Sequence, residues 1–135
     1  VKKNYPSTIN IKIKLTKFVA RLSNNEQFVG ANGKLIFNKE SKEILPYVFG
    51  EFNSEDFLDL KKNIEKSKFN FKKFKTLYFF PSSRWDILTS NDILIKLPRD
   101  NLFESIHLAY KIINSDLFNN KKFIDLRVSN HLIIK

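Results

Sequence analysis

Histidine most often supplies acid–base or metal chemistry near neutral pH, and the sequence contains 2 histidines. Neither His107 nor His131 belongs to a His-x-His or His-Glu-x-x-His spacing, so no zinc ligand set is indicated. The chain has no cysteine, which excludes disulfides and thiolate catalysis. Its 3 glycines form no phosphate-binding loop, and no pair of carboxylates suggests acid–base work. We therefore expect a protein with no catalytic residues, no metal site and no cofactor.

Arginine points to binding chemistry instead, because its planar guanidinium can donate two parallel hydrogen bonds to a carboxylate. Arg127 lies in an alternating stretch that is typical of a half-buried strand. Ile124, Leu126 and Val128 are expected on the apolar face of this strand, with Arg127 on the polar face. Arg84 begins a predicted hairpin and is a second candidate for pairing with an acidic partner residue.

The end of the sequence predicts an open sheet edge. Ser129-Asn130 is typical of a turn, and residues 131–135 are expected to return as a strand. Unpaired N–H and C=O groups on such an edge can pair with a strand of another protein. The residues expected to contact a partner are therefore Arg84, Arg127, Val128, Ser129, Asn130, His131, Leu132 and Ile133.

Nucleic-acid binding is an alternative function, suggested by a formal net charge of +10 at pH 7. In the stretch Phe69–Lys75, lysines alternate with phenylalanines that could stack on bases. Phenylalanine, lysine and asparagine are abundant throughout the chain, however, and no signature of an RNA-recognition motif is present. A basic nucleic-acid-binding module therefore stays the second hypothesis, behind binding of a protein partner.

The length of 135 residues suits one compact domain, or one domain with a fragment of another. The 14 phenylalanines and the 42% hydrophobic share are sufficient for a core. No run approaches the ~20 consecutive apolar residues that a membrane-spanning helix needs. Because the sequence lacks methionine, we expect a piece of a longer protein, with any export signal or membrane anchor upstream.

Several short strands and two helices are predicted to position these residues. Residues 8–16 alternate strictly between aliphatic and polar side chains, which predicts a one-sided strand. One helix is expected from Asn53 to about Lys66, capped by Asn53 with Asp56 reaching back. A second is expected from about Asn101 to Leu117, with Asn101 and Glu104 at capping-box spacing. Further strands are predicted at 18–22, 28–29, 34–37, 76–80, 84–89, 93–97 and 123–128.

This pattern predicts an α+β fold, in which two helices cover one face of a mostly antiparallel mixed sheet. Residues 76–80 are apolar on both faces and are expected to form a central strand. Trp85, Ile87, Ile93 and Ile95 are the residues of the following hairpin that should point into the core.

A set of short motifs in a fixed order resembles the extracytoplasmic part of the FtsQ/DivIB family of bacterial cell-division proteins. Tyr5-Pro6-Ser7-Thr8-Ile9 resembles the family's entry to the last strand of a POTRA domain. The motifs that resemble the following β domain are Val19-Ala20-Arg21, Val29 with Gly33, Leu45-Pro46 with Gly50, Arg84-Trp85-Asp86-Ile87-Leu88 with Asn91-Asp92 and Leu97, and Ile124-Asp125-Leu126-Arg127. The similarity extends over nearly the whole chain.

The resemblance implies that residues 1–17 end a POTRA domain and that residues 18–135 form the β domain. It implies a divisome scaffold without catalytic activity, which binds FtsB- and FtsL-type partners. It also implies a single-pass protein of the bacterial inner membrane at the division septum. This part would be periplasmic, on the outer side of the membrane, and the transmembrane helix would lie upstream of the present sequence.

Overall fold

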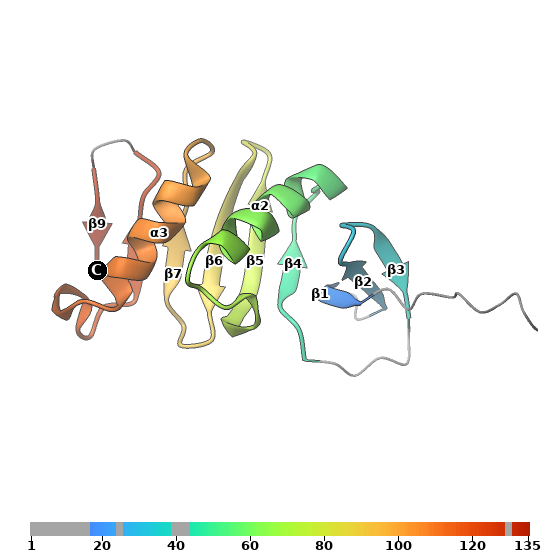
Figure 1. The fold of residues 1–135 in the computed structure, drawn as a ribbon, viewed down its shortest axis with the longest axis horizontal. Helices are drawn as coiled ribbons and strands as arrows, with labels where there is room; N and C mark the ends of the chain where they lie inside the picture. Colours follow the sequence, from blue (N-terminus) through green and yellow to red (C-terminus); the bar gives the residue numbers. More distant parts are fainter. Residues whose placement is uncertain (1–16, 24–25, 39–43, 129–130) are drawn as a thin grey trace, which may run out of the picture.

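The computed structural model describes residues 17–23, 26–38, 44–128 and 131–135. In this part of the chain, nine strands form one sheet with the order β3-β2-β1-β4-β5-β6-β7-β8-β9 (Figure 1). The predicted strand at 8–16 and the predicted turn at Ser129-Asn130 lie outside the described residues. The strands are β1 (Phe18–Leu22), β2 (Gln27–Gly30), β3 (Leu35–Phe37), β4 (Tyr47–Phe49), β5 (Phe74–Phe80), β6 (Arg84–Thr89), β7 (Leu94–Lys96), β8 (Phe123–Asp125) and β9 (Ile133–Ile134).

The sheet is mixed and mostly antiparallel, as predicted. The antiparallel pairs are β1–β2, β2–β3, β5–β6, β6–β7 and β8–β9. Parallel pairs join β1 to β4, β4 to β5, and β7 to β8, and the last two connections each contain a helix. Strand β5 lies in the middle of the sheet, which confirms the prediction from its apolar residues on both faces.

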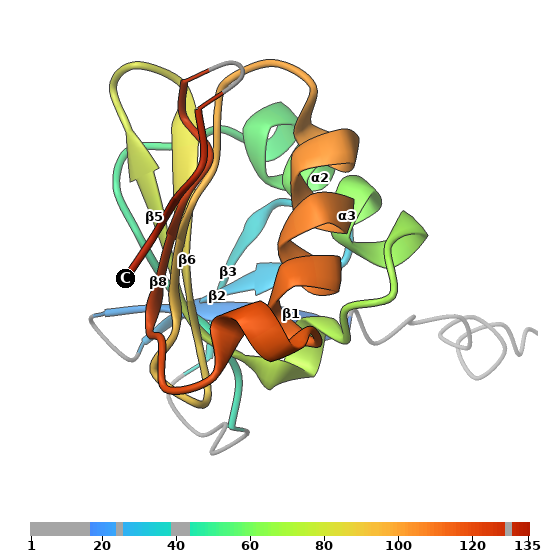
Figure 2. The same cartoon turned by 90° about the vertical axis from the view of Figure 1, so that its left-hand side faces the viewer.

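Both helices, α2 (Ser54–Lys66) and α3 (Leu102–Ile113), cover the same face of the sheet, as expected (Figure 2). Helix α2 begins at the predicted cap. The Asn53 side chain accepts a hydrogen bond from Asp56 N at 2.8 Å, and the Asp56 carboxylate accepts one from Asn53 N at 3.0 Å. The capping box satisfies two N–H groups that have no partner inside the helix.

Helix α3 differs from its prediction at both ends. Asn101 has a left-handed backbone (φ 56°) and makes no side-chain cap bond, so the predicted capping box is wrong. The helix ends at Ile113 instead of Leu117. The Asn114 side chain donates to Tyr110 O and the Ser115 hydroxyl donates to Ile112 O, and such bonds compete with continuation of a helix. Leu117, expected on the apolar face, is 75% exposed in a short 3-10 turn.

The core lies between the sheet and the two helices. Trp85, Ile87, Ile93 and Ile95 are all buried, which confirms their predicted direction. The Trp85 ring contacts Phe79 and Phe52, with ring centroids 4.8 and 6.0 Å away. The other buried apolar residues include Ala20, Val29, Val48, Leu77 and Ile124 from the sheet, and Phe57, Leu60, Ile64, Ile106, Ala109 and Ile112 from the helices.

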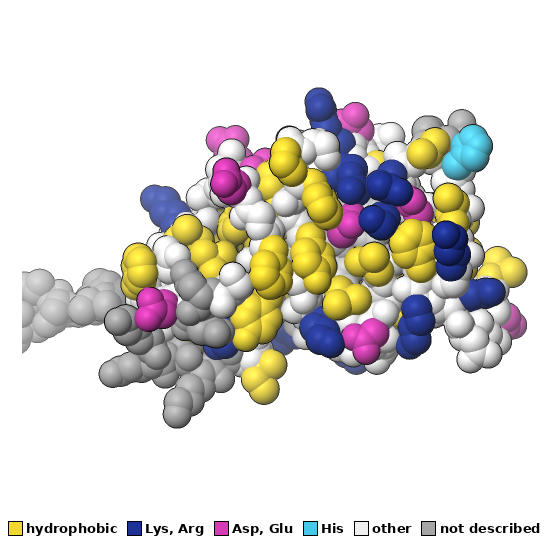
Figure 3. Space-filling view, turned by 180° about the vertical axis from the view of Figure 1, so that it is seen from behind, with side chains coloured by type: hydrophobic (Ala, Val, Ile, Leu, Met, Phe, Trp, Pro, Cys, Tyr) yellow, Lys and Arg dark blue, Asp and Glu magenta, His cyan; other side chains and the backbone are white. Residues whose placement is uncertain are grey.

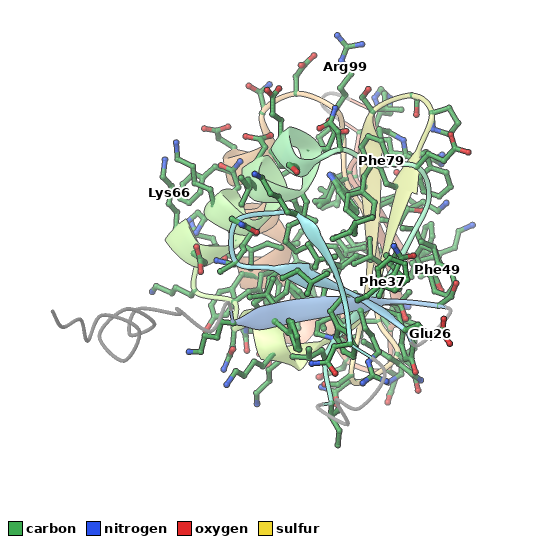
Figure 4. The ribbon with its side chains drawn as sticks, turned by 90° about the vertical axis from the view of Figure 1, so that its right-hand side faces the viewer. Glu26, Phe37, Phe49, Lys66, Phe79 and Arg99 are labelled. Carbon is green, nitrogen blue, oxygen red and sulfur yellow. The ribbon has the colours of Figure 1, made fainter. Side chains whose placement is uncertain are left out.

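The opposite face of the sheet carries no helix among the described residues, and we call it the open face. Phe49 pairs in register with Tyr78, and each follows a buried residue, Val48 or Leu77. Phe80 pairs with Arg84, which precedes the buried Trp85. Because successive side chains of a strand point to opposite faces, these four side chains point away from the core. In Figure 4, Phe49 lies on the side of the sheet opposite the helices. Figure 3 shows hydrophobic side chains across the middle of this face, with Lys and Arg gathered toward β7 to β9.

Candidate functional site

One groove of about 950 Å³ brings together several of the predicted partner-binding residues: Arg84, Arg127, Val128, His131 and Leu132. It lies where β6 and α3 begin and where the chain leaves β8. Arg99, at the same end of the molecule, also lines it (Figure 4). The remaining lining residues are Ser82, Pro98, Asp100, Asn101, Glu104, Ser105, Leu108 and Leu126.

Arg84 is fixed by bonds within the domain. Its Nη1 donates to Asp86 Oδ1 and to Leu97 O, both at 2.9 Å. The guanidinium also lies over the Phe80 ring, 5.0 Å from its centroid. Arg84 therefore borders the groove as a largely buried cation whose guanidinium position is fixed by contacts within the domain.

Arg127 makes the bidentate contact that its chemistry predicts, but with a residue of its own chain. Its Nε and Nη2 donate to the two carboxylate oxygens of Asp125, at 2.9 and 2.7 Å. These hydrogen bonds hold the pKa of Asp125 below its ordinary value, against the opposing effect of burial. The same contact raises the pKa of Arg127. The Arg127 side chain stays 43% exposed, so it still presents positive charge to the groove.

A row of charges connects the two arginines across three strands. Asp86 pairs in register with Lys96 on β7, and Lys96 pairs with Asp125 on β8. Lys96 Nζ lies 3.4 Å from Asp86 Oδ2, and its positive charge also lowers the pKa of Asp125. Arg84 and Arg127 are therefore the two ends of one ion-pair row, and its buried carboxylates keep both guanidinium groups in place.

The strand prediction around Val128 is wrong. Strand β8 ends at Asp125, so Val128 does not continue the apolar face of Ile124 and Leu126, and it is 61% exposed. Asp125 lies on the other face, as expected, but it is buried beneath its ion pair instead of being solvated. His131 and Leu132 are exposed beside Val128, and Ser129 and Asn130 lie outside the described residues.

The direction of the main chain in β9 follows from the hydrogen bonds of Lys135. Lys135 N donates to Phe123 O, and Phe123 N donates to Lys135 O, both at 3.0 Å. Main-chain groups alternate in direction along a strand, so Ile133 also points its N–H and C=O toward β8, while Ile134 points them outward. Ile133 thus offers a partner its exposed side chain, and Ile134 offers its main chain. Ile134 was missed because side-chain periodicity identifies the face of a residue and not its edge.

Comparison with protein families identifies the family of this chain. The family model described as "Cell division protein FtsQ/DivIB, C-terminal" matches residues 18–127. The chain belongs to the FtsQ/DivIB family. FtsQ/DivIB proteins act in bacterial cell division, which is the role that the sequence resemblance implied. No protein in the curated collection matches this FtsQ/DivIB chain.

Solved structures support the FtsQ/DivIB fold. The chain is similar to the major extracytoplasmic domain of the trans isomer of the bacterial cell division protein DivIB from Geobacillus stearothermophilus. The TM-score is 0.52 at 10% sequence identity, and the match covers 75% of this chain and 93% of that chain. At this identity the likeness shows the fold, and it confirms the predicted α+β architecture.

The segment that suggested nucleic-acid binding packs inward in this FtsQ/DivIB chain. Phe74 is buried, and the Phe69 ring contacts the rings of Phe74 and Tyr110 with centroids 5.4 and 5.1 Å away. Phe71 meets Phe57 of α2 edge to face. These rings pack against the core, with Phe74 buried and Phe69 and Phe71 half-buried, which is the arrangement expected of structural aromatic residues.

Residues 17–23, 26–38, 44–128 and 131–135 contain no group of three or more His, Cys, Asp or Glu side chains that could hold a metal ion. Among the helices described, none has the length and hydropathy to cross a bilayer.

Proposed function

We propose that this FtsQ/DivIB chain is a non-catalytic scaffold of the division machinery that binds FtsB- and FtsL-type partners by strand addition at β9. The domain would lie outside the inner membrane at the septum, tethered by a transmembrane helix upstream of residue 1. Residues 1–17 would end a preceding POTRA domain. Family membership supports the cell-division role, and the partners, the tether and the location are parts of the proposal.

The observation that carries the proposal is the outer edge of β9 beside the groove. Among the described strands, none pairs with the outer side of β9. The main chain of Ile134 points outward there, and the exposed side chains of Leu132 and Ile133 lie along the same short segment. A partner strand would gain main-chain hydrogen bonds from this edge, and the groove could receive the residues that precede or follow that strand.

Charge would supply the choice of partner, because strand addition alone discriminates poorly between sequences. Arg84, Arg99 and Arg127 all line the groove. Asp125 engages two of the guanidinium nitrogens of Arg127, which leaves the Nη1 side for a carboxylate of the partner. The partner segment should therefore carry acidic residues next to its strand.

The test uses a synthetic peptide from the FtsB-type protein of the same organism, with single backbone N-methyl groups at successive positions. A methyl group on an N–H that faces β9 should weaken binding by roughly tenfold or more, and one on the next residue should have little effect. Isothermal titration calorimetry measures the dissociation constant of each methylated peptide for the 135-residue chain. The alternation is the result expected, because N–H groups in a strand point alternately to its two sides.

Equal losses at adjacent positions, or no loss at any position, would refute strand addition. The matched control on the protein is Lys62→Gln, which removes one positive charge from the exposed surface of α2, away from the groove. This variant should bind the unmodified peptide as the wild type does. If it weakens binding as much as an edge-facing methyl group, the general positive field is responsible and the edge is not.

A further inference from the structure

The open face carries a row of aromatic side chains that is not part of the partner-binding site proposed above. The row crosses β4 and β5: Tyr47 and Phe49 have ring centroids 6.5 Å apart, and Phe49 and Tyr78 have centroids 5.5 Å apart. Phe49 is 40% exposed and its neighbours are half-buried. Parallel strands such as β4 and β5 are ordinarily covered on both faces, but the described residues cover only one. This half of the sheet therefore presents apolar surface that favours a partner.

Cations stand beside aromatic rings along the same face. The guanidinium of Arg21 lies 5.6 Å from the centroid of Tyr47, and that of Arg84 lies 5.0 Å from the centroid of Phe80. Directly after β9, Lys135 Nζ lies 5.6 Å from the centroid of the Phe123 ring, which shares this face through its register with Leu94. Each pair combines an apolar ring with a positive charge, the combination that is typical of residues at a membrane interface.

The charge of the open face indicates a negative partner. Around β6 to β9 it carries the cations Arg84, Lys96, Arg127 and Lys135 in contact with two carboxylates, Asp86 and Asp125, or with an aromatic ring. Both carboxylates are already paired with these cations. Figure 3 shows the same excess of Lys and Arg beside the hydrophobic middle. A second copy of the chain would place this positive surface against itself, so charge disfavours a dimer through the open face.

The shape of the face favours a flat partner. Three hollows of the described residues, of about 950, 320 and 880 Å³, are lined by residues other than Tyr47, Phe49 and Tyr78. Protein segments that bind tightly usually seat an anchor side chain in a pocket, and the row offers none of these hollows. We propose that the open face rests on the headgroup layer of an anionic lipid bilayer, with its rings at the acyl boundary and its cations at the phosphates.

The experiment is co-sedimentation of the full 135-residue chain with phosphatidylcholine vesicles, with and without roughly 30% phosphatidylglycerol. Binding should be at least about tenfold stronger to the anionic vesicles and should weaken between about 0.05 and 0.5 M salt. Equal binding to both vesicles, or none to either, would overturn the proposal. Tighter binding to soluble polyglutamate than to anionic vesicles at an equal charge concentration would point to an acidic protein as the occupant and would also overturn the proposal.

Paired variants locate the contact. Phe49→Ser should weaken binding to anionic vesicles, whereas Leu117→Ser, at an exposed leucine away from the row, should not. Lys135→Gln should weaken binding by roughly fivefold, and Lys62→Gln on α2 by much less. Circular dichroism and urea unfolding check that each variant is folded. If Phe49→Ser does not fold, the comparison of Lys135→Gln with Lys62→Gln decides the outcome. Equal effects within both pairs would contradict a contact through the open face. The peptide titration at β9 is independent, so either proposal can fail alone.

Discussion

Asp125 is the carboxylate on which the order of the proposed site depends. It is 6% exposed, and it accepts hydrogen bonds from Arg127 N, Nε and Nη2. Removing the Arg127 side chain would leave the buried Asp125 carboxylate with only the more distant charge of Lys96, which costs more than the net value of the pair. The arginine that we propose as a partner contact is thus held in position by a carboxylate that is itself almost fully buried.

The first prediction concerns the dependence of stability on pH. The pKa of Asp125 is lower in the folded chain than its ordinary value of 3.8, so its contribution is fully present above that value and is lost as the pH falls through the folded pKa. The Asp125→Asn variant lacks this contribution. The difference in unfolding free energy between wild type and variant should therefore shrink between about pH 6 and pH 3. Urea unfolding at both pH values measures it.

An independent measurement is an NMR titration of the Asp125 carboxyl carbon in the folded chain. A pKa at or above 3.8 would contradict the proposed electrostatics, whatever the unfolding data show. The ion pair between Asp92 and Lys75 serves as a comparison for the effect of salt, because both of its side chains are exposed. Salt should weaken the Asp92 pair more than the Asp125 pair.

Residue chemistry was predictable where one face of a strand decides the outcome. Trp85 and Ile87 alternate with polar residues, and both are buried as expected. The pairing of Arg127 was not predicted, although Asp125 and Arg127 lie two residues apart. Sequence alone does not show that β8 ends at Asp125 and that the chain then bends, which brings the guanidinium back over the carboxylate.

At the scale of elements, an asparagine precedes each of the two helices, but only one of them caps its helix with a side-chain hydrogen bond. Asn53 caps α2 with an extended backbone and an accepting side chain, whereas Asn101 begins α3 in the left-handed region without a cap bond. Both sites look alike in sequence, because each asparagine has an acidic residue three positions later. Only Asn53 could be predicted correctly, since backbone conformation at a cap depends on how the preceding chain arrives.

The second prediction compares these two positions. Asn53→Ala should cost about 1 kcal/mol of unfolding free energy, because it removes the acceptor for the Asp56 N–H. Asn101→Gly should change it by less than about 0.5 kcal/mol, because glycine adopts positive φ without strain and no side-chain bond is lost. Urea unfolding at neutral pH checks both. Similar costs at the two positions would show that Asn101 also acts as a cap in solution.

At the scale of the molecule, the sheet is held together unevenly. Strands β5 and β6 pair along their whole lengths, from Phe74↔Thr89 to Phe80↔Arg84. The three N-terminal strands join the rest through only two pairs, Arg21↔Tyr47 and Leu22↔Val48. Although Ala20 and Val29 belong to the shared core, we expect the N-terminal strands to open more readily than the layer formed by β5, β6 and the helices.

The third prediction is a difference in hydrogen exchange. Amides in β2, such as Phe28 and Val29, should exchange through openings that cost at least about 2 kcal/mol less than those of Leu77 and Tyr78 in β5. Native-state exchange monitored by NMR measures both sets. Identical opening free energies, equal to that of global unfolding, would show that the whole sheet unfolds as one unit.

Fold class was predictable from the alternation of short strands with two apolar helical stripes. Strand order was not, because the parallel pairs β1–β4 and β7–β8 join segments far apart in the sequence. Local patterns carry no information about such pairing. The groove was likewise out of reach, since it forms only when the start of β6, the start of α3 and the chain after β8 meet.

The order of the sheet also has a consequence for how the chain acquires its edge. From β4 onward, spatial order follows chain order, so each new strand adds beside the one completed before it. A chain emerging from its N-terminal end would display the edge of β5, then β6, then β7, each with different side chains and a different direction. The β9 edge exists only after all of these have formed. A partner that reads that edge would therefore distinguish finished molecules from those still folding, with no separate inspection step.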